Sequence, residues 1–339
     1  GTGTDRWDID VTSAPVAVDI RSAGADGFVM ELVSGSKIYK VPSLTNRNPG
    51  APGSLTLWRD MNSISFDINA DGSPDQYFVK LMNDPDEYGI DTHSSTSVAD
   101  IDKDGFVDVV VTGALNSSTG RSTVFYWNVQ DNTVTGYMTP NSAQLGIPNN
   151  QKPDHDNYLN GWIWGTGRVN IGDADGDGVL DLLFVAGNQL FCFTTNAANG
   201  LVQKWVRTIN DSRSGVLTVT IYDFDNDGNP EVVYRDSQEL AIVDGATGSN
   251  KLFSRTCMSH TYTEGPIIAD VNGDGNTDIC VSCNRSDNPA QFKIDASIQQ
   301  QALGEVRIFF SDGEWLPTRK VWNQPGYFVV NINDDLTLP

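Results

Sequence analysis

The chain has 339 residues, a formal net charge of −22 and 39% hydrophobic residues. So acidic a chain is not expected to bind nucleic acid or anionic lipid, because both need basic patches. Its hydrophobic content is typical of a folded protein and not of an acidic disordered tail. No run of about 18 apolar residues is present, so direct membrane insertion is not expected.

The first part of the chain contains several short runs that alternate apolar and polar residues, the pattern of β-strands. The runs are Trp7–Val11, Val16–Val18, Phe28–Met30, Lys37–Tyr39 and Leu55–Trp58. The segment from Asp19 to Gly27 resembles a degenerate copy of the acidic loop that recurs further along the chain. Its acidic residues are too far apart in the sequence to predict a metal site.

A nine-residue acidic loop then recurs five times, each time before a short β-branched or aromatic run. Oxygen-bearing side chains occupy positions 1, 3, 5 and 9, and Gly occupies position 6. We name each loop by its first residue. The predicted metal ligands are Asp67, Asn69, Asp71 and Asp75; Asp100, Asp102, Asp104 and Asp108; Asp173, Asp175, Asp177 and Asp181; Asp223, Asp225, Asp227 and Glu231; and Asp270, Asn272, Asp274 and Asp278.

This pattern is typical of calcium binding. Ca²⁺ takes roughly six to eight oxygen ligands, and a tight turn lets alternate side chains converge on one point. Glycine at position 6 allows a positive φ without a Cβ clash, and a backbone carbonyl near position 7 normally joins the ligands. Metal-free acidic surface turns are the alternative, but five loops in register favour the metal.

An EF-hand begins in the same way but needs a bidentate Glu at position 12 and a helix on each side. The flanking runs here predict strands. Position 12 holds a residue that cannot bind calcium in every loop: Phe78, Val111, Phe184, Tyr234 and Val281.

The unit of strand, acidic loop and strand resembles the FG-GAP/VCBS repeat of integrin-α-like β-propellers. The resemblance covers nearly the whole chain. It implies an all-β ring of four-stranded blades, with Ca²⁺ in the loop that joins the first and second strands of a blade. With degenerate copies at Asp19 and Asn331, we expect seven blades, six being the alternative, in one domain over residues 1–339 whose terminal strands close the ring.

The unit at Asp67 is short for a blade, because the next loop begins only 33 residues further on. This unit is either trimmed or borrows a strand.

The five loops contain eighteen carboxylates, so about five structural Ca²⁺ ions would offset ten negative charges. Without metal these groups repel one another at close range, and folding should be coupled to calcium. Sites of this kind fill where calcium is abundant, which favours an extracellular or cell-surface location.

The chain has four cysteines: Cys192, Cys257, Cys280 and Cys283. The Cys280–Cys283 pair lacks the second pair or spaced histidines that a zinc site needs. Cys280 lies in a buried-strand pattern and is expected to be a free thiol in the core. Cys257 and Cys283 could form a disulfide between neighbouring blades, but connectivity does not follow from sequence.

Two insertions, Met138–Gly167 and Asn284–Leu303, are expected on the face opposite the calcium loops, where long loops on a rigid scaffold commonly bind ligands. The first carries the candidate ligand-binding residues Asp154, His155, Asp156, Tyr158, Trp162 and Trp164. Aromatic rings beside polar groups suit a glycan or protein ligand. Alternatively, the two tryptophans pack inside the next blade and His155 lies in an exposed turn.

The C-terminal stretch 321–339 resembles a segment of very large surface adhesins of gliding Bacteroidetes-type bacteria, which implies flanking domains in a longer exported protein. The sequence therefore predicts an extracellular calcium-binding adhesion module without catalytic residues. It contains no GxSxG, HExxH or phosphate-loop motif, and only three histidines. The alternatives are a polysaccharide-acting lyase or hydrolase on a propeller scaffold and a passive spacer in a surface fibre.

Overall fold

The protein is all-β, with one three-residue 3₁₀ helix, η1 (Met61–Ser63), in the part of the chain that the structure describes. The computed structural model describes residues 15–20, 30–41, 55–74, 78–79, 95–115, 122–140, 167–198, 200–211, 217–249, 251–259, 265–284 and 304–321. Over these ranges, no helix has the length and apolar character needed to cross a membrane.

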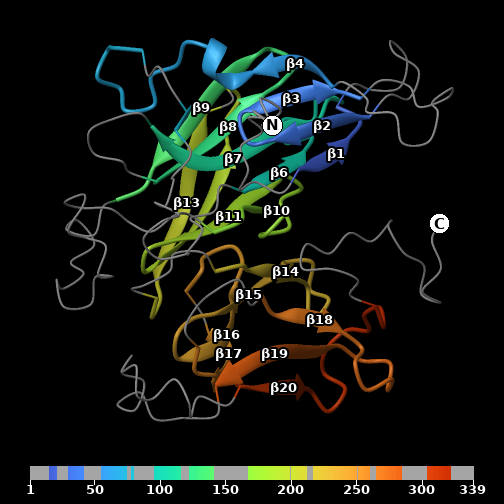
Figure 1. Ribbon diagram of the computed structural model, residues 1–339. Coiled ribbons are helices and arrows are strands. Elements are labelled where there is room, and N and C mark those ends of the chain that lie inside the picture. Colours follow the sequence, from blue (N-terminus) through green and yellow to red (C-terminus); the bar gives the residue numbers. More distant parts are fainter. Residues whose placement is uncertain are drawn as a thin grey trace, which may run out of the picture.

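The strands form five antiparallel sheets (Figure 1). Sheet 1 contains β1 (Val16–Val18), β2 (Glu31–Ser34), β3 (Lys37–Lys40) and β4 (Thr56–Asp60). Sheet 2 contains β5 (Phe78–Val79), β6 (Thr96–Ala99), β7 (Asp108–Leu115), β8 (Ser122–Asn128) and β9 (Thr133–Met138). Sheet 3 contains β10 (Asn170–Gly172), β11 (Asp181–Ala186), β12 (Gln189–Thr195) and β13 (Leu201–Thr208). Sheet 4 contains β14 (Thr220–Tyr222), β15 (Glu231–Arg235), β16 (Glu239–Asp244) and β17 (Lys251–Thr256). Sheet 5 contains β18 (Ile267–Ala269), β19 (Asp278–Asn284) and β20 (Gly304–Phe310).

Consecutive sheets pack face to face, and a cluster of buried apolar side chains fills each contact. Successive residues of a strand point to opposite faces. On β7, Val109 and Val111 pack toward sheet 1, whereas Val110 packs toward sheet 3. On β11, Leu182 packs toward sheet 2 and Leu183 toward sheet 4. Strands β7 and β11 are therefore buried on both faces, which explains the continuous apolar runs that follow their acidic loops.

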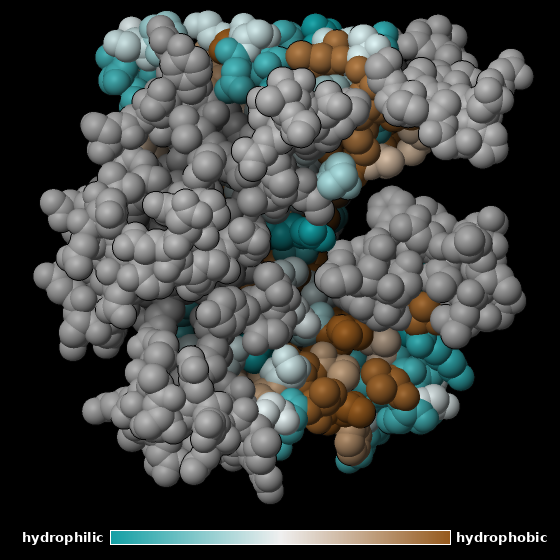
Figure 2. Space-filling view, viewed as in Figure 1, coloured by the Kyte–Doolittle hydropathy of each residue, from teal (hydrophilic) through white to brown (hydrophobic). Residues whose placement is uncertain are grey.

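The two end sheets have only one face covered by another described sheet. On β20 of sheet 5, Val306, Ile308 and Phe310 share the outer face, and Val306 is 68% exposed. On β4 of sheet 1, Leu57 is also exposed. Figure 2 shows hydrophobic side chains at the surface in the part of the molecule where Figure 1 places β14 to β20.

The unit at Asp67 differs from a separate blade. Residues 64–66, which precede its loop, contain only a single-residue bridge at Phe66, and the chain passes through η1 just before them. Its following strand, β5, pairs with the end of β7, where Phe78 lies opposite Leu115. β6 pairs with the beginning of β7 along the same edge. The aromatic run after the loop predicted a strand here. Because β7 is long enough to pair with β6 at its beginning and with β5 at its end, β5 joins sheet 2 and does not start a sheet of its own.

A disulfide joins Cys257, just after β17, to Cys283 on β19, with a Cα–Cα distance of 5.1 Å. It links sheet 4 to sheet 5, the pairing that the sequence left open. Cys192 and Cys280 are free, as predicted for Cys280. The prediction that Cys280 lies in the core was wrong: Cys192 is buried, whereas Cys280 is partly exposed on the outer face of sheet 5, because no described sheet covers that face.

Candidate metal centre

Four of the five acidic loops join two consecutive antiparallel strands of a sheet. In sheets 3, 4 and 5 these are the first and second strands, as predicted, whereas in sheet 2 they are β6 and β7. Residue 9 of each loop begins the second strand and lies opposite the residue that precedes position 1. The pairs are Ala99 with Asp108, Gly172 with Asp181, Tyr222 with Glu231, and Ala269 with Asp278. The antiparallel register thus places the first and last acid of each loop at the same end of the sheet.

All five loops share one backbone conformation. The glycine at position 6 has a positive φ of 83–93° in every loop, as predicted: Gly72, Gly105, Gly178, Gly228 and Gly275. The sequence did not predict that position 4 is also left-handed, with φ of 56–81°, at Ala70, Lys103, Gly176, Asn226 and Gly273. Alanine and lysine rarely adopt this conformation, so the loop imposes it.

Backbone N–H groups hold the acidic side chains in place. The carboxylate at position 1 accepts a hydrogen bond of 2.8–3.2 Å from the N–H of residue 6 in all five loops. The carboxylate at position 5 accepts one of 2.7–2.8 Å from the N–H of residue 7. The side chain at position 3 accepts one from the N–H of residue 5, at 2.8–3.4 Å. These hydrogen bonds fix the orientation of the side chains at positions 1, 3 and 5 in each loop.

The acid at position 9 is buried in each of the four hairpin loops, with at most 4% of its surface exposed. It accepts a hydrogen bond of 2.8–3.1 Å from the N–H of residue 2. Burial, followed by the negative charge of Asp102, raises the pKa of Asp108 to about 7. Burial likewise raises the pKa of Glu231 to about 7.

Several of these oxygens lack a hydrogen-bond partner. Asp100 Oδ1, Asp108 Oδ1 and Asp173 Oδ1 are buried and accept no hydrogen bond in the described part of the chain. A buried carboxylate oxygen without a partner is costly. Three groups of ligand atoms, each within 4.8 Å of one another, belong to Asp100, Asp102 and Asp104; to Asp173, Asp175 and Asp181; and to Asp223, Asp225 and Glu231. The all-oxygen donor set and its unpaired buried atoms fit a hard divalent cation such as Ca²⁺.

The raised pKa values predict how metal-free protein responds to pH. Asp and Glu titrate near pH 4 when unfolded, whereas Asp108 and Glu231 titrate near pH 7 when folded. Between these values the folded state binds more protons, so its stability falls as pH rises. In excess chelator, the urea midpoint should decrease between pH 5 and pH 8. Asp108→Asn should reduce this decrease, and a midpoint that is constant or rises would contradict the prediction.

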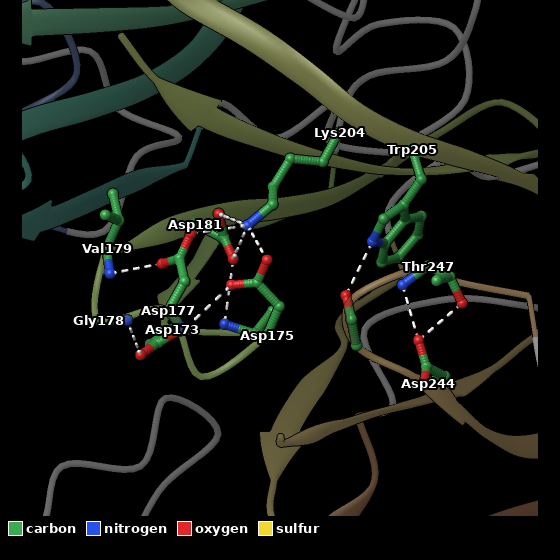
Figure 3. A network of polar contacts seen from close by, with 12 residues as sticks. Asp173, Asp175, Asp177, Gly178, Val179, Asp181, Lys204, Trp205, Asp244 and Thr247 are labelled. Carbon is green, nitrogen blue, oxygen red and sulfur yellow. Dashed lines mark hydrogen bonds and ion pairs between the residues drawn. The ribbon is translucent and has the colours of Figure 1, made fainter. Parts of the chain in front are cut away.

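The Asp173 loop contains a cation from its own sheet (Figure 3). The ammonium of Lys204, on β13, forms an ion pair with Asp175 and lies 3.6 Å from Asp177 Oδ2 and 3.2 Å from Asp181 Oδ1. Burial disfavours the charged form of Lys204, but the hydrogen bonds to Asp175 and Asp181 and their negative charges outweigh this effect and raise its pKa. The Asp100 loop receives neutral donors from β8: Asn128 donates to Asp102 and Tyr126 to Asp108.

Neighbouring loops also touch one another. The Lys103 ammonium, at position 4 of its loop, donates to the carbonyl of Gly178, at position 6 of the next loop. A Cβ on Gly176, again at position 4, would lie 2.0 Å from the carbonyl oxygen of Gly228 at position 6 of the following loop. The Asp100, Asp173 and Asp223 loops therefore form a row, in which only a residue without a Cβ fits at 176.

Sheet 1 carries the same hairpin in modified form. Val18 lies opposite Glu31, which begins β2, and the N–H of Ile20 donates to Glu31 Oε2 at 3.0 Å. Glu31 is buried and thus takes the place of residue 9, with Asp19 at position 1. The sequence pattern indicated Asp19 but not Glu31, because the segment between them is longer than in the other loops. The signal that could have identified Glu31 is the position of an acidic residue at the start of an apolar strand.

The Asp67 loop has the same internal hydrogen bonds but is not a hairpin between paired strands. Its predicted ligand Asp75 lies outside the described residues. The candidate ligand-binding residues Asp154, His155, Asp156, Tyr158, Trp162 and Trp164 also lie outside them.

Two overlapping segments of the chain, residues 173–234 and 223–281, match the model of the FG-GAP-like repeat. The matched segments contain the whole Asp173, Asp223 and Asp270 loops, the strands β11 and β15, and the first part of β19. This confirms the predicted resemblance in the part of the chain where the loops and sheets are most regular.

No curated protein sequence matches the chain. Among solved structures, the V. cholerae biofilm matrix protein Bap1 is similar with 17% identity and a TM-score of 0.45, over 96% of this chain and 74% of that one. An Agrocybe aegerita lectin described as recognising non-reducing terminal N-acetylglucosamine is similar with 14% identity and a TM-score of 0.38, over 80% of this chain. The match spans 62% of the lectin chain.

Proposed function

We propose that this chain is a calcium-stabilised β-propeller that serves as the ligand-binding or adhesion module of a larger extracellular protein. The observation that carries the proposal is the repeated loop. The same left-handed positions recur in five loops, three of the loops bring ligand atoms within 4.8 Å of one another, and buried oxygens of Asp100, Asp108 and Asp173 lack partners. Ca²⁺ would be held by the side chains at positions 1, 3, 5 and 9. Its role is structural, because it neutralises carboxylates that otherwise repel one another.

The propeller is proposed from the order and packing of the sheets. Five sheets stack in chain order, and the outer faces of sheets 1 and 5 expose apolar side chains such as Leu57 and Phe310. Residues 1–14 and 322–339 are available to form a further blade that covers both faces and closes the ring over residues 1–339. The unit at Asp67 does not form a sheet of its own, because β5 joins sheet 2. We therefore propose six blades, the alternative to the seven expected from the sequence.

The proposed ligand face is opposite the acidic loops. The loops lie where β11, β15 and β19 begin. β19 ends at Asn284 and β20 begins at Gly304, so the insertion between them leaves from the other end of sheet 5. The insertion between Met138 and β10 leaves from the same end, because β10 runs toward its acidic loop. The proposed ligand is a glycan or a protein that contacts the aromatic residues of the 138–167 insertion.

Binding to glycan and protein arrays tests this function. We expect a hit in calcium that disappears in EDTA and in Tyr158→Ala or Trp162→Ala protein whose melting temperature is unchanged. Val202→Ala, at an exposed position on β13, is the matched control and should retain binding. A blank with folded, calcium-loaded protein would contradict the binding function and favour a passive spacer. Release of soluble product from a glycan would instead favour an enzyme.

A further inference from the structure

Lys204 makes the Asp173 loop different from its neighbour in sheet 4. Its ammonium contacts the carboxylates at positions 3, 5 and 9 of the loop, and its side chain is only 17% exposed. In the described part of the chain, no ion pair reaches the acids of the Asp223 loop. Lys320 lies 3.9 Å from Asp270 in sheet 5, but its side chain is 65% exposed. Lys204 is therefore a partly buried cation within an otherwise acidic loop.

A β-bulge positions Lys204. The pairing of β12 with β13 passes from Cys192–Trp205 to Phe193–Gln203, so Lys204 has no partner in the register. The pairing of β16 with β17 has the same shift, and Leu252 is the residue without a partner.

Lys204 and Leu252 occupy equivalent places in sheets 3 and 4. Phe193 and Val243, the residues at the shift, lie opposite equivalent residues of the second strands, Leu182 and Val232. Leu252 is 58% exposed and carries no charge. The two sheets therefore offer a natural comparison of one loop with an internal ammonium and one without it.

We propose that Lys204 is an internal counter-cation that replaces part of the metal's charge in the Asp173 loop, so that this loop binds Ca²⁺ more weakly than the Asp223 loop. The inference rests on the proposed function. A divalent cation that enters the Asp173 loop must displace the ammonium from three carboxylates. The flexible four-carbon stem of lysine allows this movement, but the lost ion pairs oppose binding. In the metal-free protein, the same ion pairs stabilise sheet 3.

Substitutions at the two bulge positions, 204 and 252, test the inference. Their effects are measured by Ca²⁺ titration calorimetry and by thermal unfolding in EDTA. Lys204→Met removes the ammonium and keeps most of the stem. We expect one Ca²⁺ site to become about tenfold tighter and the melting temperature in EDTA to fall. This gain should be lost when Asp173→Asn is added. Leu252→Lys should weaken one site, because it places an ammonium near the Asp223 loop.

The outcomes separate the inference from the proposed function. If the wild-type protein binds no Ca²⁺, the calcium role is overturned. In that case a fall in the melting temperature of Lys204→Met in EDTA still supports the counter-cation, and no fall overturns it. If the wild-type protein binds Ca²⁺ but Lys204→Met changes neither the isotherm nor the melting temperature in EDTA, the inference is wrong and the calcium role stands.

Discussion

Removal of calcium is expected to lower the melting temperature of this protein by more than about 10 °C. A site filled well above its Kd contributes about 2–3 kcal/mol, so about five sites contribute on the order of 10–15 kcal/mol. For a chain of 339 residues, about 1 kcal/mol shifts the melting temperature by about 1–2 °C. The unpaired buried oxygens of Asp100, Asp108 and Asp173 identify groups that lose a partner when the metal leaves. Differential scanning calorimetry in millimolar calcium and in excess EDTA measures the effect.

Two controls make the chelation result specific. Adding calcium in excess over EDTA should restore the original melting temperature, whereas magnesium should restore less, because it demands a smaller octahedral site and retains its waters. Asp100→Asn together with Asp223→Asn should lower the melting temperature in calcium but have a smaller effect in EDTA. Equal melting temperatures in calcium and EDTA would remove the structural role of calcium from the proposed function.

Loss of the Cys257–Cys283 disulfide is expected to cost about 3.5 kcal/mol of unfolding free energy. The bridge closes a loop with a sequence separation of 26, and the estimate follows from the loop entropy it removes from the unfolded chain. The Cys257→Ser, Cys283→Ser double variant should unfold at lower urea concentration than the wild-type protein. Both cysteines are buried where sheets 4 and 5 pack, so the effect should exceed that of an exposed substitution.

The reductant provides the matched control. Dithiothreitol should destabilise the wild-type protein toward the double variant and leave the variant itself unchanged, because Cys192 and Cys280 are free. Thiol counting should first confirm that the bridge is open. If the urea midpoint of the reduced wild-type protein is then unchanged, the expected contribution of the disulfide is wrong.

The sequence alone determined the repeated chemistry of this protein. The spacing of acids in the Asp100, Asp173, Asp223 and Asp270 loops, with glycine at position 6, identified the hairpins and the strands that follow them, although each of these strands begins one residue earlier than the apolar run, at position 9. These features depend on local periodicity and turn geometry, which nine consecutive residues contain. The continuous apolar runs indicated strands, and the disulfide between Cys257 and Cys283 is one that the sequence had offered.

Only the tertiary structure decided how distant segments meet. It placed β5 on the edge of β7, paired Cys257 with Cys283, identified Glu31 as the counterpart of residue 9, and brought Lys204 into the Asp173 loop. Each outcome depends on a strand register or a bulge, and a shift of one residue would turn the side chain to the other face of its sheet. Register is set by the packing of whole sheets, so no local pattern around Lys204 distinguished it from an exposed lysine.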